Sequence, residues 1–207
     1  MAQKKITEGK GRGRPRAYDP KTALQQALGV FWNTGYSGAS LDSIATAAGM
    51  NRPSLYAAFG DKHALYIKAL EMYLEAAVAA MHAALTDQNL SVAEALMGFY
   101  EGQLSIYFSG DGQARGCFAI GTATTEAVED VEIRDTLSRL ISKLDTDLEA
   151  RLRVAIDSGE LKNDADPDAL AAVAAAMLHS IAIRARAGKS RADLTELARK
   201  AVSVICR

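Results

Sequence analysis

The side chains best equipped to recognise another molecule lie between residues 40 and 62. Arg52 carries a forked guanidinium that can bridge O6 and N7 of guanine, and the Ser54 hydroxyl can bind a base edge or a phosphate. Tyr56 and Lys62 are suited to phosphate oxygens, which fix the register of a protein on a duplex. These residue types at this spacing indicate recognition of double-stranded DNA.

Two short helices joined by a tight turn must hold these side chains in place. Ser40 is a suitable N-cap for a helix to about Ala48, and Gly49 supplies the positive φ that a tight turn needs. Asn51 then caps a second helix over residues 52–59. This is the pattern of a helix-turn-helix, whose second helix enters the major groove. The candidate DNA contacts are Ser40, Asn51, Arg52, Pro53, Ser54, Tyr56 and Lys62.

Basic residues are concentrated in the same part of the chain. Residues 1–68 hold 10 Lys and Arg against 4 Asp and Glu, whereas the remainder holds 14 against 21. Residues 1–17 are polar and lack helical periodicity, so we expect a flexible arm there. Its Arg12, Arg14 and Arg16 are suited to a narrow A·T-rich minor groove, and the alternative is a solubilising tail. A basic head on an acidic body favours a polyanion at one end.

The apolar periodicity predicts an all-α protein with nine helices. Apolar residues recur at three- and four-residue spacing, and no run of alternating β-branched residues occurs. We expect residues 18–68 to form the DNA-binding head and residues 69–207 the helical body. Caps and glycines place the helices at about residues 20–35, 40–48, 52–59, 61–85, 91–109, 116–129, 132–158, 167–187 and 190–207.

Several motifs of the head follow one another in the order of a known family. The chain reads GRPR before the first helix, TGY after it, SLDSIATAAGM through the second helix and SLYAAFGDK through the third. With these motifs, residues 13–73 resemble the N-terminal domain of the TetR family of bacterial transcriptional repressors. Positions that touch DNA in relatives are matched by Ser40, Arg52, Ser54, Tyr56 and Lys62. Ala57 stands where several relatives have a larger polar or aromatic residue.

The resemblance implies a nine-helix homodimer whose C-terminal body holds a ligand pocket and the dimer interface. The alanine-rich segment over residues 169–187 suits close helix packing against a second chain, and the alternative is a core helix of a single chain. The expected interface residues are Leu170, Ala174, Met177, Leu178, Ile181 and Leu197.

Aromatic and methionine side chains of the body are candidates for the lining of a small-molecule pocket, although each is also a suitable core residue. The expected members are Met81, Met97, Tyr100, Tyr107, Cys117, Phe118 and His179. Cys117 follows Arg115 and Gly116 at the expected start of a helix, a setting that favours the thiolate. A cysteine-based sensor of electrophiles or oxidants is therefore an alternative within the same fold, and a buried inert thiol is another.

The sequence offers little for other classes of protein. Cys117 and Cys206 have no metal-ligand spacing and the histidines are scattered, so we expect no metal and no cofactor. The apolar stretch over residues 169–183 is shorter than the roughly 20 residues of a membrane span, which favours a cytoplasmic protein without a membrane partner. An all-α enzyme would have to use Cys117 as nucleophile with His179 as base.

We therefore expect a sequence-specific DNA-binding regulator rather than an enzyme. Its expected form is a homodimeric repressor that binds a palindromic operator and is controlled by a small-molecule effector. An architectural DNA-binding protein without an effector is the remaining alternative, and a cavity in the body would distinguish the two.

Overall fold

The computed structural model describes residues 18–110 and 114–207. Within these residues the chain forms nine α-helices, one π-helical turn and no strand, which confirms the all-α prediction. The expected arm over residues 1–17, with Arg12, Arg14 and Arg16, lies outside the described residues.

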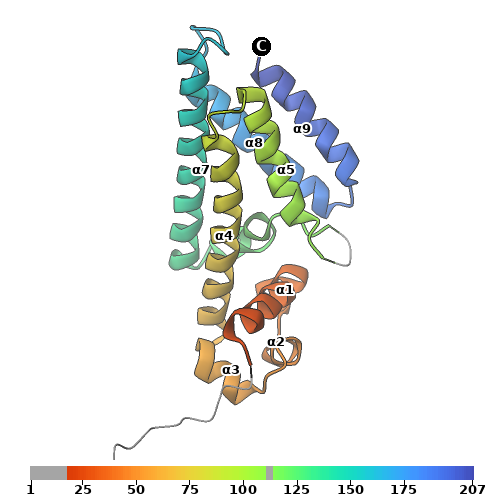
Figure 1. Cartoon of the computed structure of the whole chain (residues 1–207). Coiled ribbons are helices and arrows are strands. Elements are labelled where there is room, and N and C mark those ends of the chain that lie inside the picture. The colour runs from red at the N-terminus through yellow and green to blue at the C-terminus, as the bar shows by residue number, and fades with distance from the viewer. Residues whose placement is uncertain (1–17, 111–113) are drawn as a thin grey trace, which may run out of the picture.

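Three helices form the head at one end of the molecule (Figure 1): α1 (Pro20–Gly38), α2 (Leu41–Ala47) and α3 (Arg52–Phe59). Asp19 begins α1, because its carboxylate accepts from the backbone N–H of Thr22 at 2.9 Å. Gly35, with φ 74°, interrupts α1 where we expected it to end, and a final turn continues to Gly38. Local capping therefore fixes the bounds of the head helices to within a turn.

The head is built around an apolar core, which continues into the body through residues such as Phe118 and Ile133. Phe31 of α1, Ile44 of α2 and Leu55 of α3 are all fully buried, and Phe59 packs beside them. Tyr66, from the next helix, stacks edge-on against Phe31 with 5.1 Å between the ring centroids. These contacts help to fix the angle between α2 and α3, because α2 packs against α1 while α3 packs against α2 and the start of the next helix.

The long helix α4 (Lys62–Thr86) leaves the head and runs through the body, as Figure 1 shows. It packs against α1 at its first half and against α5 and α7 further along. Leu65 and Leu70 belong to the core of the head, whereas Met81 and Leu85 belong to the core of the body. One continuous helix thus joins the two cores.

Four further helices build the body: α5 (Val92–Tyr107), α7 (Val131–Asp157), α8 (Pro167–Arg186) and α9 (Arg191–Ile205). α8 packs between α7 and α9, and α9 packs on α5. With 20 residues and a mean hydropathy of 1.4, α8 meets the length and composition of a membrane-spanning helix, a test that core helices of soluble proteins also pass. Part of α8 is buried against its neighbours in this chain.

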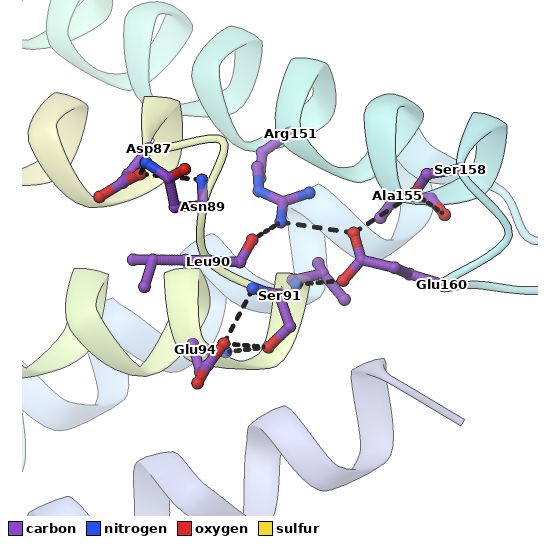
Figure 2. A network of polar contacts seen from close by, with 10 residues as sticks. Asp87, Asn89, Leu90, Ser91, Glu94, Arg151, Ala155, Ser158 and Glu160 are labelled. Carbon is purple, nitrogen blue, oxygen red and sulfur yellow. Dashed lines mark hydrogen bonds and ion pairs between the residues drawn. The ribbon is translucent and has the colours of Figure 1, made fainter.

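Polar contacts hold the loop between α4 and α5 against α7 at the far end of the body, as Figure 2 shows. The buried Arg151 donates from Nη2 to the backbone oxygen of Leu90 at 2.8 Å and pairs with Glu160 at 3.6 Å. Glu160 in turn accepts from the backbone N–H of Val92 at 2.6 Å, at the start of α5. Hydrogen bonds and an ion pair therefore link the α4–α5 loop to the segment that follows α7.

Residues 116–129 do not form the single helix that the sequence predicts. Gly116 and Cys117 stay outside a π-helical turn, η1 (Ala119–Ala123), which leads into the short α6 (Thr124–Glu126). Thr122 donates to the Phe118 oxygen at 2.9 Å. Such back-bonding to a carbonyl four residues earlier competes with regular helical geometry and widens the turn.

Candidate nucleic-acid interface

The turn between α2 and α3 sets the orientation of the recognition helix. Gly49 adopts φ 62° and donates to the Thr46 oxygen at 3.1 Å, while Met50 donates to the Ala45 oxygen at 2.9 Å. These two bonds are those of a Schellman motif, which needs a left-handed residue such as glycine. α3 then begins directly at Arg52.

One face of α3 is open to solvent. Arg52, Pro53, Tyr56 and Ala57 are exposed and Ser54 is half-buried, whereas Leu55 points into the head. Tyr56 is exposed to 47%, an unusually high value for a large aromatic side chain. An exposed aromatic beside an arginine on a short helix is suited to a partner with phosphates and base edges.

Two of the predicted contact residues serve first as helix caps. Ser40 Oγ accepts from the Ser43 N–H at 3.0 Å, and Asn51 Oδ1 accepts from the Ser54 N–H at 2.8 Å. The Ser40 side chain is exposed beside the N-terminus of α2, where unpaired backbone N–H groups favour an anion. Asn51 keeps its Nδ2 group available, since only its oxygen is used by the cap.

Arg52 is held by a carboxylate from the neighbouring helix. Its Nε donates to Oδ1 of Asp42 and its Nη2 to Oδ2, and both side chains are more than half exposed. The hydrogen bonds from Arg52 lower the pKa of Asp42 below its usual range. Asp42 was not among the predicted contact residues, because its partner is ten residues away on another helix.

Lys62 lies at the start of α4 with its ammonium 4.5 Å from the centroid of the Tyr36 ring. A cation at a helix N-terminus is disfavoured by the helix dipole, and the ring face offsets part of that cost. The side chain is half-buried, so the aromatic ring restrains it near the surface of the head. This geometry is suited to a single phosphate contact.

A cluster of aromatic and cationic side chains joins the head to the body. The Arg115 guanidinium lies 4.1 Å from the centroid of the Trp32 ring, and Trp32 packs edge-on against Tyr73 at 5.0 Å. Phe118 contacts Trp32 from the side of the body, at 5.9 Å between centroids. We call these four residues the head–body junction.

A second contact joins the start of α4 to the start of α7. His63 Nε2 lies 2.6 Å from Oδ2 of Asp130, which caps α7 by accepting from the Ile133 N–H at 3.1 Å. The Ile133 N–H, and to a smaller degree His63, lowers the pKa of Asp130. α4 is therefore anchored to the body within one turn of Lys62.

The body holds an apolar cavity of about 60 Å³, partly open to the surface, between α4, α5, α7 and α8. Four of the predicted pocket residues contribute to its lining: Met81, Tyr107, Cys117 and His179. Met97, Tyr100 and Phe118 do not line it; Tyr100 and Phe118 are fully buried core residues, and Met97 packs against the core. Leu178, expected at a subunit interface, lines it as well. Tyr73 and Gln103 also belong to the lining, and periodicity alone could not separate them from core positions.

Cys117 is not set up as a thiolate in this structure. Burial raises the pKa of the Cys117 thiol above its usual value, although Tyr73 donates a hydrogen bond to its sulfur at 3.2 Å. The prediction of a favoured thiolate, which was based on the expected helix start and on Arg115, is therefore corrected. Burial disfavours the charged thiolate by more than the nearby hydrogen-bond donors favour it. Arg115 turns instead to Trp32 and to the Ser109 oxygen, to which it donates at 2.5 Å.

The expected subunit-contact residues divide into two groups. Ala174, Leu178 and Ile181 are buried in the core of this chain, so their assignment to an interface is revised. Leu170, Met177 and Leu197 are partly buried. The apolar side chains that α8 and α9 expose are instead Val173, Ile183 and Val204.

An open recognition helix in a helix-turn-helix, joined by one helix to a body with a cavity, defines a regulator of the DNA-binding class. The family model for "Bacterial regulatory proteins, tetR family" matches residues 23–69, and that for "Tetracyclin repressor-like, C-terminal domain" matches residues 93–202. The chain belongs to the TetR family of bacterial transcriptional regulators.

Individual relatives agree with this assignment over most of the chain. The HTH-type transcriptional repressor ComR of Escherichia coli (strain K12) is 31% identical over 189 residues, which cover 91% of this chain and 90% of ComR. A cysteine mutant of the TetR family regulator CifR, solved with a 26-bp double-strand operator DNA, is 34% identical with a TM-score of 0.77. That match covers 92% of this chain and 98% of the CifR chain.

Proposed function

We propose that this protein is a homodimeric repressor that inserts α3 into the major groove of a palindromic operator and leaves the operator when a small effector binds the body. Such a regulator acts in the cytoplasm, where bacterial DNA lies. The proposal rests on the exposed face of α3, which presents Arg52 and Tyr56 to solvent. The repressor name of ComR and the operator complex of CifR support it.

The contacts of the head divide into two kinds. Arg52 is the candidate base reader, because its guanidinium can bridge two acceptors of one guanine. Ser40 before α2, Tyr56 on α3 and Lys62 at the start of α4 are candidates for phosphates, which carry affinity but little sequence information. Ala57 can contribute a methyl contact with thymine.

A dimer supplies the second half-site. Two recognition helices that enter successive major grooves must lie roughly 34–36 Å apart, a spacing that one head cannot span. The exposed Val173 and Ile183 of α8 and Val204 of α9 support a four-helix contact between two bodies. Dimer formation also places the two heads in the symmetric arrangement that a palindrome requires.

An effector would act by enlarging the cavity. A volume of about 60 Å³ is far below the roughly 300–1,000 Å³ of drug-sized sites, so a ligand must displace the surrounding helices. α4 lines this cavity with Tyr73 and Met81 and carries Lys62 at its other end. A shift of α4 therefore changes the position of the head. The largest factor by which the effector can lower operator affinity is the ratio of its own affinities for the shifted and unshifted forms.

Covalent modification of Cys117 is a second candidate for the signal. Cys117 lines both the apolar cavity and a more open hollow of about 310 Å³, which Ile120, Ala182 and Arg186 also line. An electrophile could reach the thiol from the hollow, although the raised pKa keeps most of it protonated near neutral pH. Alkylation with a maleimide followed by a DNA-binding measurement tests this role, and unchanged operator affinity would exclude it.

Catalysis by Cys117 has less support. His179 lines the same cavity, yet no hydrogen bond joins the two side chains within the described part of the chain. Burial lowers the pKa of His179, which weakens it further as a base.

Selection from random-sequence duplexes with the full-length protein tests the proposal directly. We expect a palindrome with half-sites one helical turn apart, bound by a dimer. Arg52→Ala should reduce the preference at one base pair of each half-site by about 1–3 kcal/mol. Arg153→Ala, an exposed arginine of α7, is the matched control and should leave that preference unchanged. Selection of no sequence, or an unchanged preference in Arg52→Ala, would refute the assignment of α3.

A further inference from the structure

We propose that Asp42 determines base specificity by holding the Arg52 guanidinium with its outer edge towards a guanine. The inference rests on the proposed function, because it assigns a positioning role within the same recognition surface. It adds a residue on α2 to a reading surface otherwise built from α3.

The geometry of the pair leaves the reading edge of Arg52 free. A guanidinium has two edges with paired N–H donors: a side edge with Nε and Nη2, and an end edge with Nη1 and Nη2. Asp42 occupies the side edge, since its two oxygens accept from Nε and Nη2. The end edge keeps one N–H on each nitrogen, which is the fork that bridges O6 and N7 of guanine. Arg52 can therefore bind Asp42 and a guanine at the same time.

The position of Asp42 is otherwise unfavourable for a DNA-binding surface. Among the acidic residues of the described head, Asp19 and Asp61 cap helices through hydrogen bonds to Thr22 and Ala64. Asp42 is exposed in the first turn of α2 and has no capping bond, and its carboxylate would repel nearby phosphates. Neutralisation by Arg52 removes that repulsion only while the two side chains stay paired.

Fixing the arginine also favours one base over the others. A free arginine side chain has many rotamers and can reach phosphates or acceptors of several bases, whereas a paired one presents its donors in a single direction. Since the N–H groups on the side edge are already used, the remaining fork matches two adjacent acceptors best. Asp42 thus restricts Arg52 to a guanine rather than increasing its attraction to DNA in general.

The test uses Asp42→Asn in the full-length protein, with the duplex selected for the parent and a set of single-base-pair variants of it. Asparagine has almost the same shape but lacks the charge and one of the two acceptor oxygens. We expect the preference for guanine to fall by roughly tenfold, within the range of a bidentate contact, at the base pair that Arg52→Ala also affects. Binding to an unrelated duplex should be unchanged or tighter, because a negative charge has been removed.

The double variant separates positioning from general stability. If Asp42 acts only through Arg52, Asp42→Asn should have no further effect on base preference in the Arg52→Ala background. Glu71→Gln, which removes an exposed charge of α4 that is in no ion pair within residues 18–110 and 114–207, is the control and should keep the parent's preference. Thermal unfolding should be similar for all variants, since Asp42 is exposed.

An unchanged guanine preference in Asp42→Asn would overturn the inference, and so would an equal loss of affinity for every duplex. Effects that add fully in the double variant would overturn it as well. A failure of the proposed function is recognised separately, because Arg52→Ala itself would then leave every base preference intact.

Discussion

Arg186 of α8 donates from Nη1 to the backbone oxygen of Trp32 in α1, over 3.3 Å. The same Nη1 donates to the backbone oxygen of Arg115 at 3.2 Å. One guanidinium therefore links α8 of the body, α1 of the head and the segment with Arg115 that follows α5. α8 is also the helix that we propose for the subunit contact, so the junction connects that contact with the head.

Loss of this link should loosen the head without unfolding the body core. We expect Arg186→Ala to lower the free energy of unfolding by about 1–2 kcal/mol, because two charge-assisted hydrogen bonds are lost at a partly solvated site. Urea unfolding measures the change. Arg184→Ala is the matched control, since the Arg184 side chain bonds, within the described residues, to Ser180 of its own helix. Equal effects of the two substitutions would contradict a role for the link.

Gly116 has a left-handed backbone conformation and no room for a side chain. Its φ is 65°, and a Cβ atom would lie 2.4 Å from the Ala182 oxygen. We expect Gly116→Ala to lower the free energy of unfolding by about 3 kcal/mol or more, from left-handed strain plus the clash. Gly159 has a similar φ of 79° but open space where a Cβ atom would lie. Gly159→Ala should therefore lower the free energy of unfolding by only about 1 kcal/mol. Chemical denaturation of both variants measures the difference, and similar values would show that the loop yields easily.

Lys62 should contribute to affinity and not to sequence choice. We expect Lys62→Ala to weaken binding to specific and unrelated duplexes alike, and to reduce the slope of log K against log salt by about one, as for one phosphate contact. Titrations at several salt concentrations measure this slope. Lys68→Ala, at an exposed position further along α4, should change it less. A loss confined to a single base pair would mean that Lys62 reads a base.

The reactivity of Cys117 should depend on pH and on Tyr73. Because the folded thiol has a raised pKa, the thiolate that reacts is scarce at neutral pH, and alkylation should accelerate as the pH rises through that pKa. Tyr73→Phe removes a hydrogen bond that lowers the pKa, so its reaction should be slower at the same pH. Maleimide kinetics in a Cys206→Ser background measure both effects. Faster alkylation in Tyr73→Phe would show that access, not ionisation, limits the reaction.

The helix bounds were predictable because the signals that set them are local. Asp19, Asn51 and Asp61 each accept from an N–H three residues later, as their sequence context indicates. Ser91 and Glu94 form a capping box, whose residues are only three positions apart in the sequence. The break in residues 116–129 was not predictable, since it lies where Thr122 bonds both to the Phe118 oxygen at 2.9 Å and, across the fold, to Tyr66 at 2.8 Å.

The position of a site residue was predictable only where the exposure of its side chain follows from the periodicity of a single helix. The outward position of Arg52 follows from the periodicity of α3, but its pairing with Asp42 depends on the angle between two helices. In α8, alanines occur on every side, so the sequence does not specify which face is buried. Leu178 and Ile181 accordingly lie inside the chain and not on its surface.

Trp32 is the single tryptophan of the sequence, and it lies at the head–body junction between Arg115, Tyr73 and Phe118. Intrinsic fluorescence excited at the indole band therefore originates at the place where the two parts meet. The protein carries its own optical probe of domain movement, so effector titrations and stopped-flow experiments need no attached dye.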